Sequence, residues 1–176
     1  GHDRFKFLNK GFNVRTIEDW NSPEQDKLWL YNLHYFDDLN AVGSMQRNSW
    51  HCSLVQRWIN ENPIGVGNGW ESYPLSLRIV NWIKWSLLND NLKKEWLDSL
   101  AVQVRFLSQK LEYHLLANHL FANAKALIFA GLYFQDSESD KWYQSGIKIL
   151  NKELHEQILA DGGNFELSPM YHAIFL

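Results

Sequence analysis

The chain has 176 residues and a mass of 20.8 kDa, and 45% of its residues are hydrophobic and 15% aromatic, which is typical of one folded domain. The aromatic content excludes an intrinsically disordered chain, and the single cysteine, Cys52, excludes an internal disulfide and a cysteine-rich metal site. The formal net charge of −3 argues against nonspecific nucleic-acid binding but is compatible with an acidic glycan held in a locally basic cleft.

In chain order, residues 1–21 are mixed in character, and we expect an irregular N-terminal lead-in there. Ser22 and Pro23 mark the first helix start, because serine is a preferred N-cap and proline a preferred first helical residue. Apolar residues at helical spacing predict helices over 22–41, 47–60, 74–88, 94–111, 115–134 and 139–159, and another from about residue 168. No apolar run reaches the roughly 20 residues that a membrane-spanning helix needs.

The helical segments have similar lengths and short connections, and no segment shows sustained strict alternation of polar and apolar residues. We therefore expect a nearly all-α chain built from antiparallel helical hairpins. Helical bundles, superhelices and α/α toroids all fit this pattern, and the periodicity alone does not choose among them.

One long loop interrupts the helices over residues 62–70, with the sequence NPIGVGNGW. Its three alternating glycines and one proline break any helix. It lacks the Gly-Lys-Ser/Thr ending of a phosphate-binding loop, and no strand is expected before it. Long loops in compact domains tend to be functional, and we expect a functional role for this one.

The end of this loop and the segment after it carry Trp70, Glu71, Tyr73 and Arg78. Flat aromatic faces suit sugar rings, and arginine is well shaped to bind a carboxylate with two hydrogen bonds. The structural alternatives are that the aromatic side chains fill the core and that Arg78 forms an ion pair with Glu71.

The most informative helix is the one over 115–134. His114, Asn118 and Lys125 fall near one stripe, at spacings of four and seven, and His119 follows directly after Asn118. Polar groups in an otherwise apolar helix are costly to bury unless they are hydrogen-bonded. They belong either to a functional site or to a network that caps neighbouring loops, and the spacing does not decide between these two hypotheses.

A second polar stretch follows the turn at 161–163. Tyr171 and His172 are both residue types that transfer protons in enzymes. The structural alternative is a tyrosine that fills a groove beside a solvated histidine.

These blocks together resemble the N-terminal helical region of the heparinase II/III-like polysaccharide lyases, a group that includes heparan-sulfate lyases and alginate lyases. The resemblance covers about residues 5–176 and is specific for the family but not for a substrate. The blocks that carry it are LWLYNLHYFD at 28–37, NP with Gly65, Gly67 and GWE at 62–71, Tyr73-Pro74 with Arg78, NHLFANAK at 118–125, and DGG at 161–163 through Tyr171-His172.

The resemblance implies an all-α fold, an incomplete (α/α) toroid over residues 22–176 that follows the lead-in at 1–21. It also implies that further helices and a C-terminal antiparallel β-sandwich domain follow in the same polypeptide. Members of the family cleave acidic polysaccharides by β-elimination at a uronic acid. An acidic polysaccharide is therefore the expected partner, and nucleic acid is not.

The resemblance also implies roles for individual residues. Asn118, with His119 beside it, would neutralise the substrate carboxylate, and Tyr171, followed by His172, would be the catalytic tyrosine. A further catalytic histidine lies in the C-terminal region of the family. An amide suits the neutralisation of the substrate carboxylate, because negative charge develops on that carboxylate during elimination and the amide can donate a hydrogen bond to it. We expect substrate contacts from Trp70, Glu71, Tyr73, Arg78, His114 and Lys125.

Two other hypotheses remain open from the sequence: a noncatalytic helical module that binds acidic glycans, and a structural helical domain. No cofactor is expected, and no His-Glu-x-x-His motif is present. The sequence does not address the need for a divalent metal. Because the polymer would be extracellular, we expect a periplasmic or secreted protein, with a cytoplasmic location as the alternative.

Overall fold

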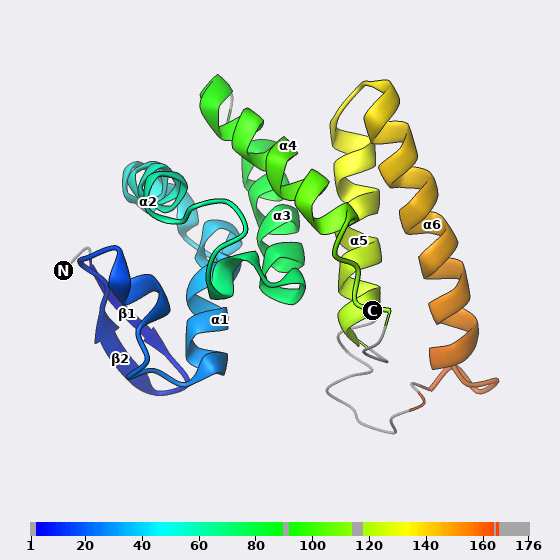
Figure 1. Ribbon diagram of the computed structural model, residues 1–176, viewed down its shortest axis with the longest axis horizontal. Coiled ribbons are helices and arrows are strands. Elements are labelled where there is room, and N and C mark those ends of the chain that lie inside the picture. The colour runs from blue at the N-terminus through cyan, green and yellow to red at the C-terminus, as the bar shows by residue number, and fades with distance from the viewer. Residues whose placement is uncertain (1–2, 90–91, 114–117, 164, 166–176) are drawn as a thin grey trace.

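The computed structural model describes residues 3–89, 92–113, 118–163 and 165. Within these residues the chain forms six α-helices, several short 3-10 helices and one β-hairpin (Figure 1). The α-helices are α1 (Lys27–Tyr35), α2 (Asn48–Glu61), α3 (Ser72–Ser86), α4 (Lys94–Ser108), α5 (Asn118–Tyr133) and α6 (Ser137–Gln157). The helices predicted from the apolar spacing between residues 47 and 159 are confirmed, with small differences at their ends, whereas the helix predicted from residue 168 lies outside the described residues.

The sequence predicts an irregular N-terminal lead-in, and this prediction is wrong. Strands β1 (Arg4–Phe7) and β2 (Lys10–Asn13) form an antiparallel hairpin in which Phe5 lies opposite Phe12. The intervening Leu8 and Asn9 both adopt positive φ angles, 52° and 62°, as a two-residue turn between twisted strands requires. The four-residue strands are too short to show a clear alternation, and Leu-Asn is not a common turn sequence. The sequence therefore carried no strong signal for this hairpin.

The first predicted helix, over 22–41, is divided in the structure. Helix α1 ends at Tyr35 because Phe36 takes a left-handed conformation, with φ 62° and ψ 32°, and a short 3-10 helix follows over Asp37–Asn40. The Phe36 ring is buried edge-on against Trp58 and Trp82, with centroids 6.4 and 5.5 Å away. Tertiary packing thus ends a helix that the local apolar spacing would continue.

Helices α1, α3 and α5 run in the same direction, with α3 between the other two (Figure 1). Tyr73, near the N-terminal end of α3, contacts Tyr35 at the C-terminal end of α1 on one side and His119 in the first turn of α5 on the other. Towards the other end, the Lys84 ammonium of α3 lies 5.8 Å from the ring centroid of Phe129 in α5. Helices α4 and α6 reverse the chain direction, which confirms the expected antiparallel hairpins for α3–α4 and α5–α6, whereas α2 is seen end-on and crosses the other helices (Figure 1).

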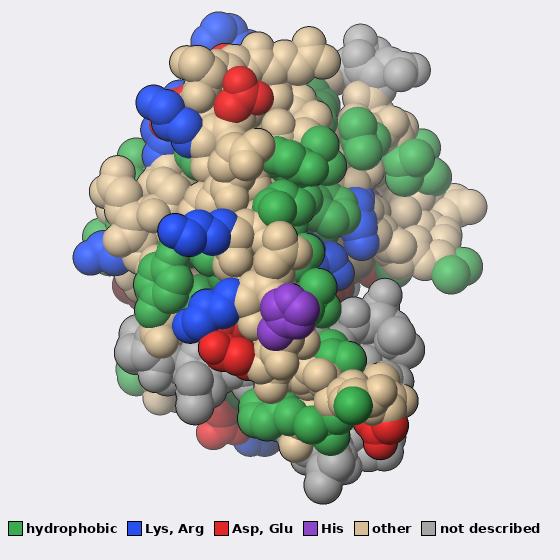
Figure 2. Space-filling model, turned by 90° about the vertical axis from the view of Figure 1, so that its right-hand side faces the viewer, with side chains coloured by type: hydrophobic (Ala, Val, Ile, Leu, Met, Phe, Trp, Pro, Cys, Tyr) green, Lys and Arg blue, Asp and Glu red, His purple; other side chains and the backbone are tan. Residues whose placement is uncertain are grey.

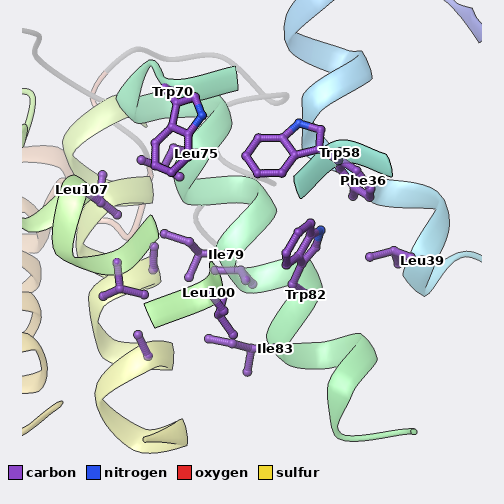
Figure 3. Close-up of a cluster of buried hydrophobic side chains, with 14 of the residues drawn as sticks. Phe36, Leu39, Trp58, Trp70, Leu75, Ile79, Trp82, Ile83, Leu100 and Leu107 are labelled. Carbon is purple, nitrogen blue, oxygen red and sulfur yellow. The ribbon is translucent and has the colours of Figure 1, made fainter. Parts of the chain in front are cut away.

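The core is centred on α3, in which eleven of fifteen residues are buried. Its apolar face packs Leu75, Ile79 and Ile83 between α4 and the aromatic side chains of the N-terminal half (Figure 3). Eight of the nine tryptophans are buried, so the interpretation as core residues is correct for most of the tryptophans.

The face formed by α6 is mixed in character. Hydrophobic, basic and acidic side chains are interspersed on it, without one dominant kind (Figure 2). Among the helices described, none combines the length and the apolar character needed to cross a membrane.

Candidate active site

A cavity of about 150 Å³ lies between α3 and α5, and Asp37 of the 3-10 helix over Asp37–Asn40 also lines it. Three residues singled out from the sequence, Tyr73, Asn118 and Lys125, line it together. The remaining lining residues are Asp37, Leu77, Val80, Asn81, Lys84, Phe121 and Ala122. The residues from α3 and from α5 each recur at spacings of three and four, so each helix presents one face to the cavity.

At one end of the cavity, the two helices are joined by stacked rings. The imidazole of His119 lies over the phenol of Tyr73, with centroids 4.4 Å apart and planes inclined by 30°. Tyr35 of α1 meets the same phenol edge-on, at 6.1 Å. This three-ring contact fixes α5 against α3 and α1, and it places Asn118 at the cavity wall.

Glu112, which the sequence reasoning missed, anchors this arrangement. Its Oε1 atom lies 3.2 Å from Nδ1 of His119, and its Oε2 atom accepts a hydrogen bond from Nδ2 of Asn123 at 3.2 Å. A carboxylate only accepts hydrogen bonds, so Nδ1 of His119 is the donor and Nε2 is left for other contacts. Glu112 lies in the connection between α4 and α5, where no periodicity singles out a residue.

Asn123 is a structural residue. Its side-chain Oδ1 accepts a hydrogen bond from the backbone N–H of Glu112 at 2.9 Å, and its Nδ2 donates to Oγ of Ser76 at 3.0 Å. The side chain is fully buried and therefore needs these partners. For Asn123, the hypothesis that polar groups of this helix cap a neighbouring loop is correct.

Two lysines, Lys84 and Lys125, line the cavity from opposite helices. Partial burial, followed by the positive charge of Lys84, lowers the pKa of the Lys125 ammonium. The carboxylate of Asp37 lines the same cavity and accepts a hydrogen bond from Nδ2 of Asn81 at 2.7 Å. The cavity wall thus carries two cations and one anion that is already hydrogen-bonded to the protein.

Glu71 lies close to the cavity but does not line it. It precedes the first residue of α3, accepts a hydrogen bond from the Tyr31 hydroxyl and forms an ion pair with Lys27 at 2.9 Å. Burial, together with this bond to Glu71, raises the pKa of the Tyr31 phenol. The carboxylate therefore links α1 to α3, and the structure gives it a structural role.

The predicted contact of Trp70 with a sugar ring is wrong, because its ring does not present a face to solvent. Only 5% of its surface is exposed, because its ring is packed against Trp58 and edge-on against Phe106, with centroids 5.8 and 5.2 Å away. Its indole N–H donates to the backbone oxygen of Asn62 at 3.3 Å. Trp70 is a core residue that fastens the end of the glycine loop.

Arg78 is likewise in the core, which corrects its assignment to substrate binding. Its Nε donates to Oε1 of Gln103 at 2.8 Å, and its guanidinium carbon lies 3.9 Å from the ring centroid of Trp58. The side chain is fully buried, and it forms no ion pair with Glu71. One helical residue turns the side chain by about 100°, so Arg78 points away from the cavity that its neighbour Leu77 lines.

The glycines of the loop at 62–70 are explained by packing. Gly67 has φ +80°, and a Cβ atom there would lie 2.5 Å from Oδ1 of Asn21. That oxygen accepts a hydrogen bond from the backbone N–H of Asn68 at 2.7 Å. The loop is thereby tied to the 3-10 helix over Glu18–Asn21. The sequence predicts a functional role for this loop, and the structure shows a structural one.

Three of the candidate residues, His114, Tyr171 and His172, lie outside the described residues. Within the part of the chain that the structure describes, no three His, Cys, Asp or Glu side chains are grouped so that they could hold a metal ion.

The parallel α1, α3 and α5, with α4 and α6 running in the opposite direction, are arranged as in a segment of an (α/α) toroid. The model of the family described as Heparinase II/III N-terminus matches residues 18–176, and the chain belongs to that family. The crystal structure of heparan sulfate lyase HepC from Pedobacter heparinus superimposes with a TM-score of 0.71 at 25% sequence identity, over 97% of this chain and 30% of that one. Both the expected fold and the family resemblance are confirmed.

Curated relatives agree with this assignment. A heparin-sulfate lyase from Bacteroides stercoris is 44% identical over 94% of this chain, and one from Pedobacter heparinus is 31% identical over 97%. The chain spans 31% and 28% of the lengths of these two relatives.

Proposed function

We propose that this chain forms the helical, substrate-binding part of a polysaccharide lyase that cleaves a uronate-containing acidic glycan by β-elimination. The observation that carries the proposal is that Asn118, Tyr73 and Lys125 line one cavity in a chain whose matched relatives are heparin-sulfate lyases. The same relatives favour a sulfated glycosaminoglycan over alginate as the polymer.

In the proposed reaction, a base removes the C5 proton of the uronate and the C4–O bond to the neighbouring sugar breaks. The electron pair of the C5–H bond forms the C4=C5 double bond, and the departing oxygen receives a proton. Negative charge grows on the uronate carboxylate as the C5 proton leaves. The Asn118 amide would donate a hydrogen bond to that carboxylate, a stabilisation that is greatest when the charge is greatest. Tyr171 is the proposed proton-transfer residue, from the resemblance to the family.

The electrostatics around Asn118 support this role. Tyr73 is the second residue of α3, so the N-terminal end of that helix is near this end of the cavity. Helix N-termini carry partial positive charge, which favours a nearby carboxylate. Lys84 and Lys125 add two full positive charges to the same cavity.

The test uses a chimera in which this chain replaces the matching segment of the Bacteroides stercoris lyase. Formation of the unsaturated uronate is followed by its ultraviolet absorbance. We expect Asn118→Ala to lower the turnover number by about 100-fold or more, the usual effect of removing one such donor. Tyr171→Phe should also lower it strongly. Asn151→Ala, an exposed position on α6, is the matched control and should leave the rate unchanged.

An Asn118→Ala chimera with the turnover of the parent chimera would rule out the proposed role. For the chimera, binding of a uronate oligosaccharide without product would favour the noncatalytic glycan-binding module. Neither binding nor product would favour the structural helical domain.

A further inference from the structure

The cavity between α3 and α5 has two chemically different ends. Tyr73 and Asn118 lie at the N-terminal end of the two parallel helices, beside the ring stack with His119. Lys84 follows Tyr73 by three helical turns, about 16 Å along the axis, and Lys125 follows Asn118 by two turns, about 10 Å. The two lysines therefore mark the far end of the cavity.

The charges of these lysines are not neutralised by the protein that the structure describes. Neither Lys84 nor Lys125 takes part in any ion pair with a described carboxylate. Asp37, the acidic residue among those that line the cavity, accepts a hydrogen bond from the Asn81 amide. Like charges that face a shared cavity repel one another, and an anion placed between them would relieve this repulsion.

We propose that Lys84 and Lys125 together bind a second anionic group of the glycan, a sulfate or carboxylate on a sugar unit next to the uronate that Asn118 contacts. The inference rests on the proposed function and names a further determinant of its specificity. Lys125 follows Asn118 by about 10 Å along α5, so we place the anion of the lysine pair on a neighbouring sugar unit and not on the carboxylate that Asn118 contacts. Ammonium groups act as compact point charges, so the pair selects negative charge rather than a particular oxygen geometry.

The test measures binding to the chain itself by titration calorimetry, with two probes. One is a heparin hexasaccharide, which carries sulfates and carboxylates, and the other is an unsulfated hexasaccharide of alternating glucuronate and N-acetylglucosamine. The variants are Lys84→Gln, Lys125→Gln and the double variant. Lys148→Gln, an exposed lysine on α6, is the matched control. Asn118→Ala reports on the proposed function separately.

We expect the double variant to weaken binding of the heparin hexasaccharide about tenfold or more and each single variant to weaken it less, while the control stays within about twofold. A loss confined to the heparin probe identifies the second anion as a sulfate, and an equal loss for both probes identifies it as a carboxylate. Both lysines are exposed, so we expect the variants to fold as the parent does. Thermal unfolding of each variant checks this.

Two results would overturn the inference in distinguishable ways. If Asn118→Ala weakens binding but the double lysine variant binds as the parent does, the proposed function stands and the lysine pair has no part in it. If the parent chain binds neither hexasaccharide, the proposed function fails, and this inference fails with it.

Discussion

The imidazole of His119 lies over the phenol ring of Tyr73, with ring centroids 4.4 Å apart. This contact joins the first turn of α5 to the first turn of α3, the two helices that form the walls of the candidate cavity. Since Asn118 directly precedes His119, the stack also sets the position of the amide to which we assign carboxylate recognition. The geometry of the proposed site therefore depends on an aromatic contact between residues 46 positions apart.

Removing the Tyr73 ring should loosen this end of the cavity. We expect Tyr73→Ala to weaken uronate oligosaccharide binding several-fold, because stacked aromatic pairs contribute about 0.5–1.5 kcal/mol beyond their buried area. Tyr73→Phe keeps the ring and should retain most of the affinity. Titration calorimetry measures both, and equal affinities for the Ala and Phe variants would contradict a role for the ring.

Replacing Glu112 should destabilise the fold. Glu112→Ala leaves Nδ2 of the buried Asn123 with one partner fewer and removes the acceptor for Nδ1 of His119. We expect the free energy of unfolding to fall by about 1–3 kcal/mol, the usual consequence of leaving a buried polar group unpaired. Denaturant unfolding tests this, with the exposed Glu24→Ala as a control that should change little. An unchanged midpoint for Glu112→Ala would show that the network does not stabilise the fold.

Arg78 should matter for stability rather than for direct glycan contact. Its guanidinium is fully buried, and burial lowers its pKa well below the usual value. Arg78→Ala removes the hydrogen bond to Gln103 and the contact with the Trp58 ring, so we expect a loss of more than about 2 kcal/mol in the free energy of unfolding. Arg15→Ala, at an exposed position, is the control. An Arg78→Ala variant that is as stable as the parent but binds the glycan more weakly would support a direct role of Arg78 in substrate binding.

The buried His34 predicts a loss of stability at acidic pH. Burial, followed by the positive charge of Arg78, lowers its pKa from 6.5 to about 3. Its Nδ1 accepts a hydrogen bond from the Trp58 indole at 3.0 Å, and its Nε2 lies 3.1 Å from the backbone oxygen of Trp20. The neutral form is therefore the one that fits the fold.

Because the unfolded chain binds the proton more tightly, the stabilisation is complete above about pH 6.5 and is lost as the pH falls towards 3. The contribution of this one group has a slope of about 1.4 kcal/mol per pH unit in that range. Denaturant unfolding from pH 7 to pH 4 measures the slope in the parent, in His34→Gln and in the exposed control His155→Gln. The slope should decrease in His34→Gln alone, and an identical slope in all three would contradict the buried neutral histidine.

The candidate residues show where sequence reasoning succeeds and where it ends. Tyr73, Asn118 and Lys125 were chosen by residue type and spacing, and they do line one cavity. Trp70 and Arg78 were chosen in the same way and are buried in the core. Chemical type alone does not separate these two groups, because tryptophan and arginine serve equally well in a core and in a binding site.

The sequence by itself determined most of the helices and the family, because helical spacing and ordered motifs are local properties of the chain. The end of α1 at Phe36, the N-terminal hairpin and the role of Glu112 were decided only by the tertiary structure. Phe36 and the hairpin depend on side chains far away in sequence, Trp58 and Trp82 for Phe36 and Trp29 for the hairpin. Glu112 depends on the way the connection before α5 folds back onto His119 and Asn123. A step of one residue turns a helical side chain by about 100°, so only the packing of neighbouring helices decides which residues face the cavity and which face the core.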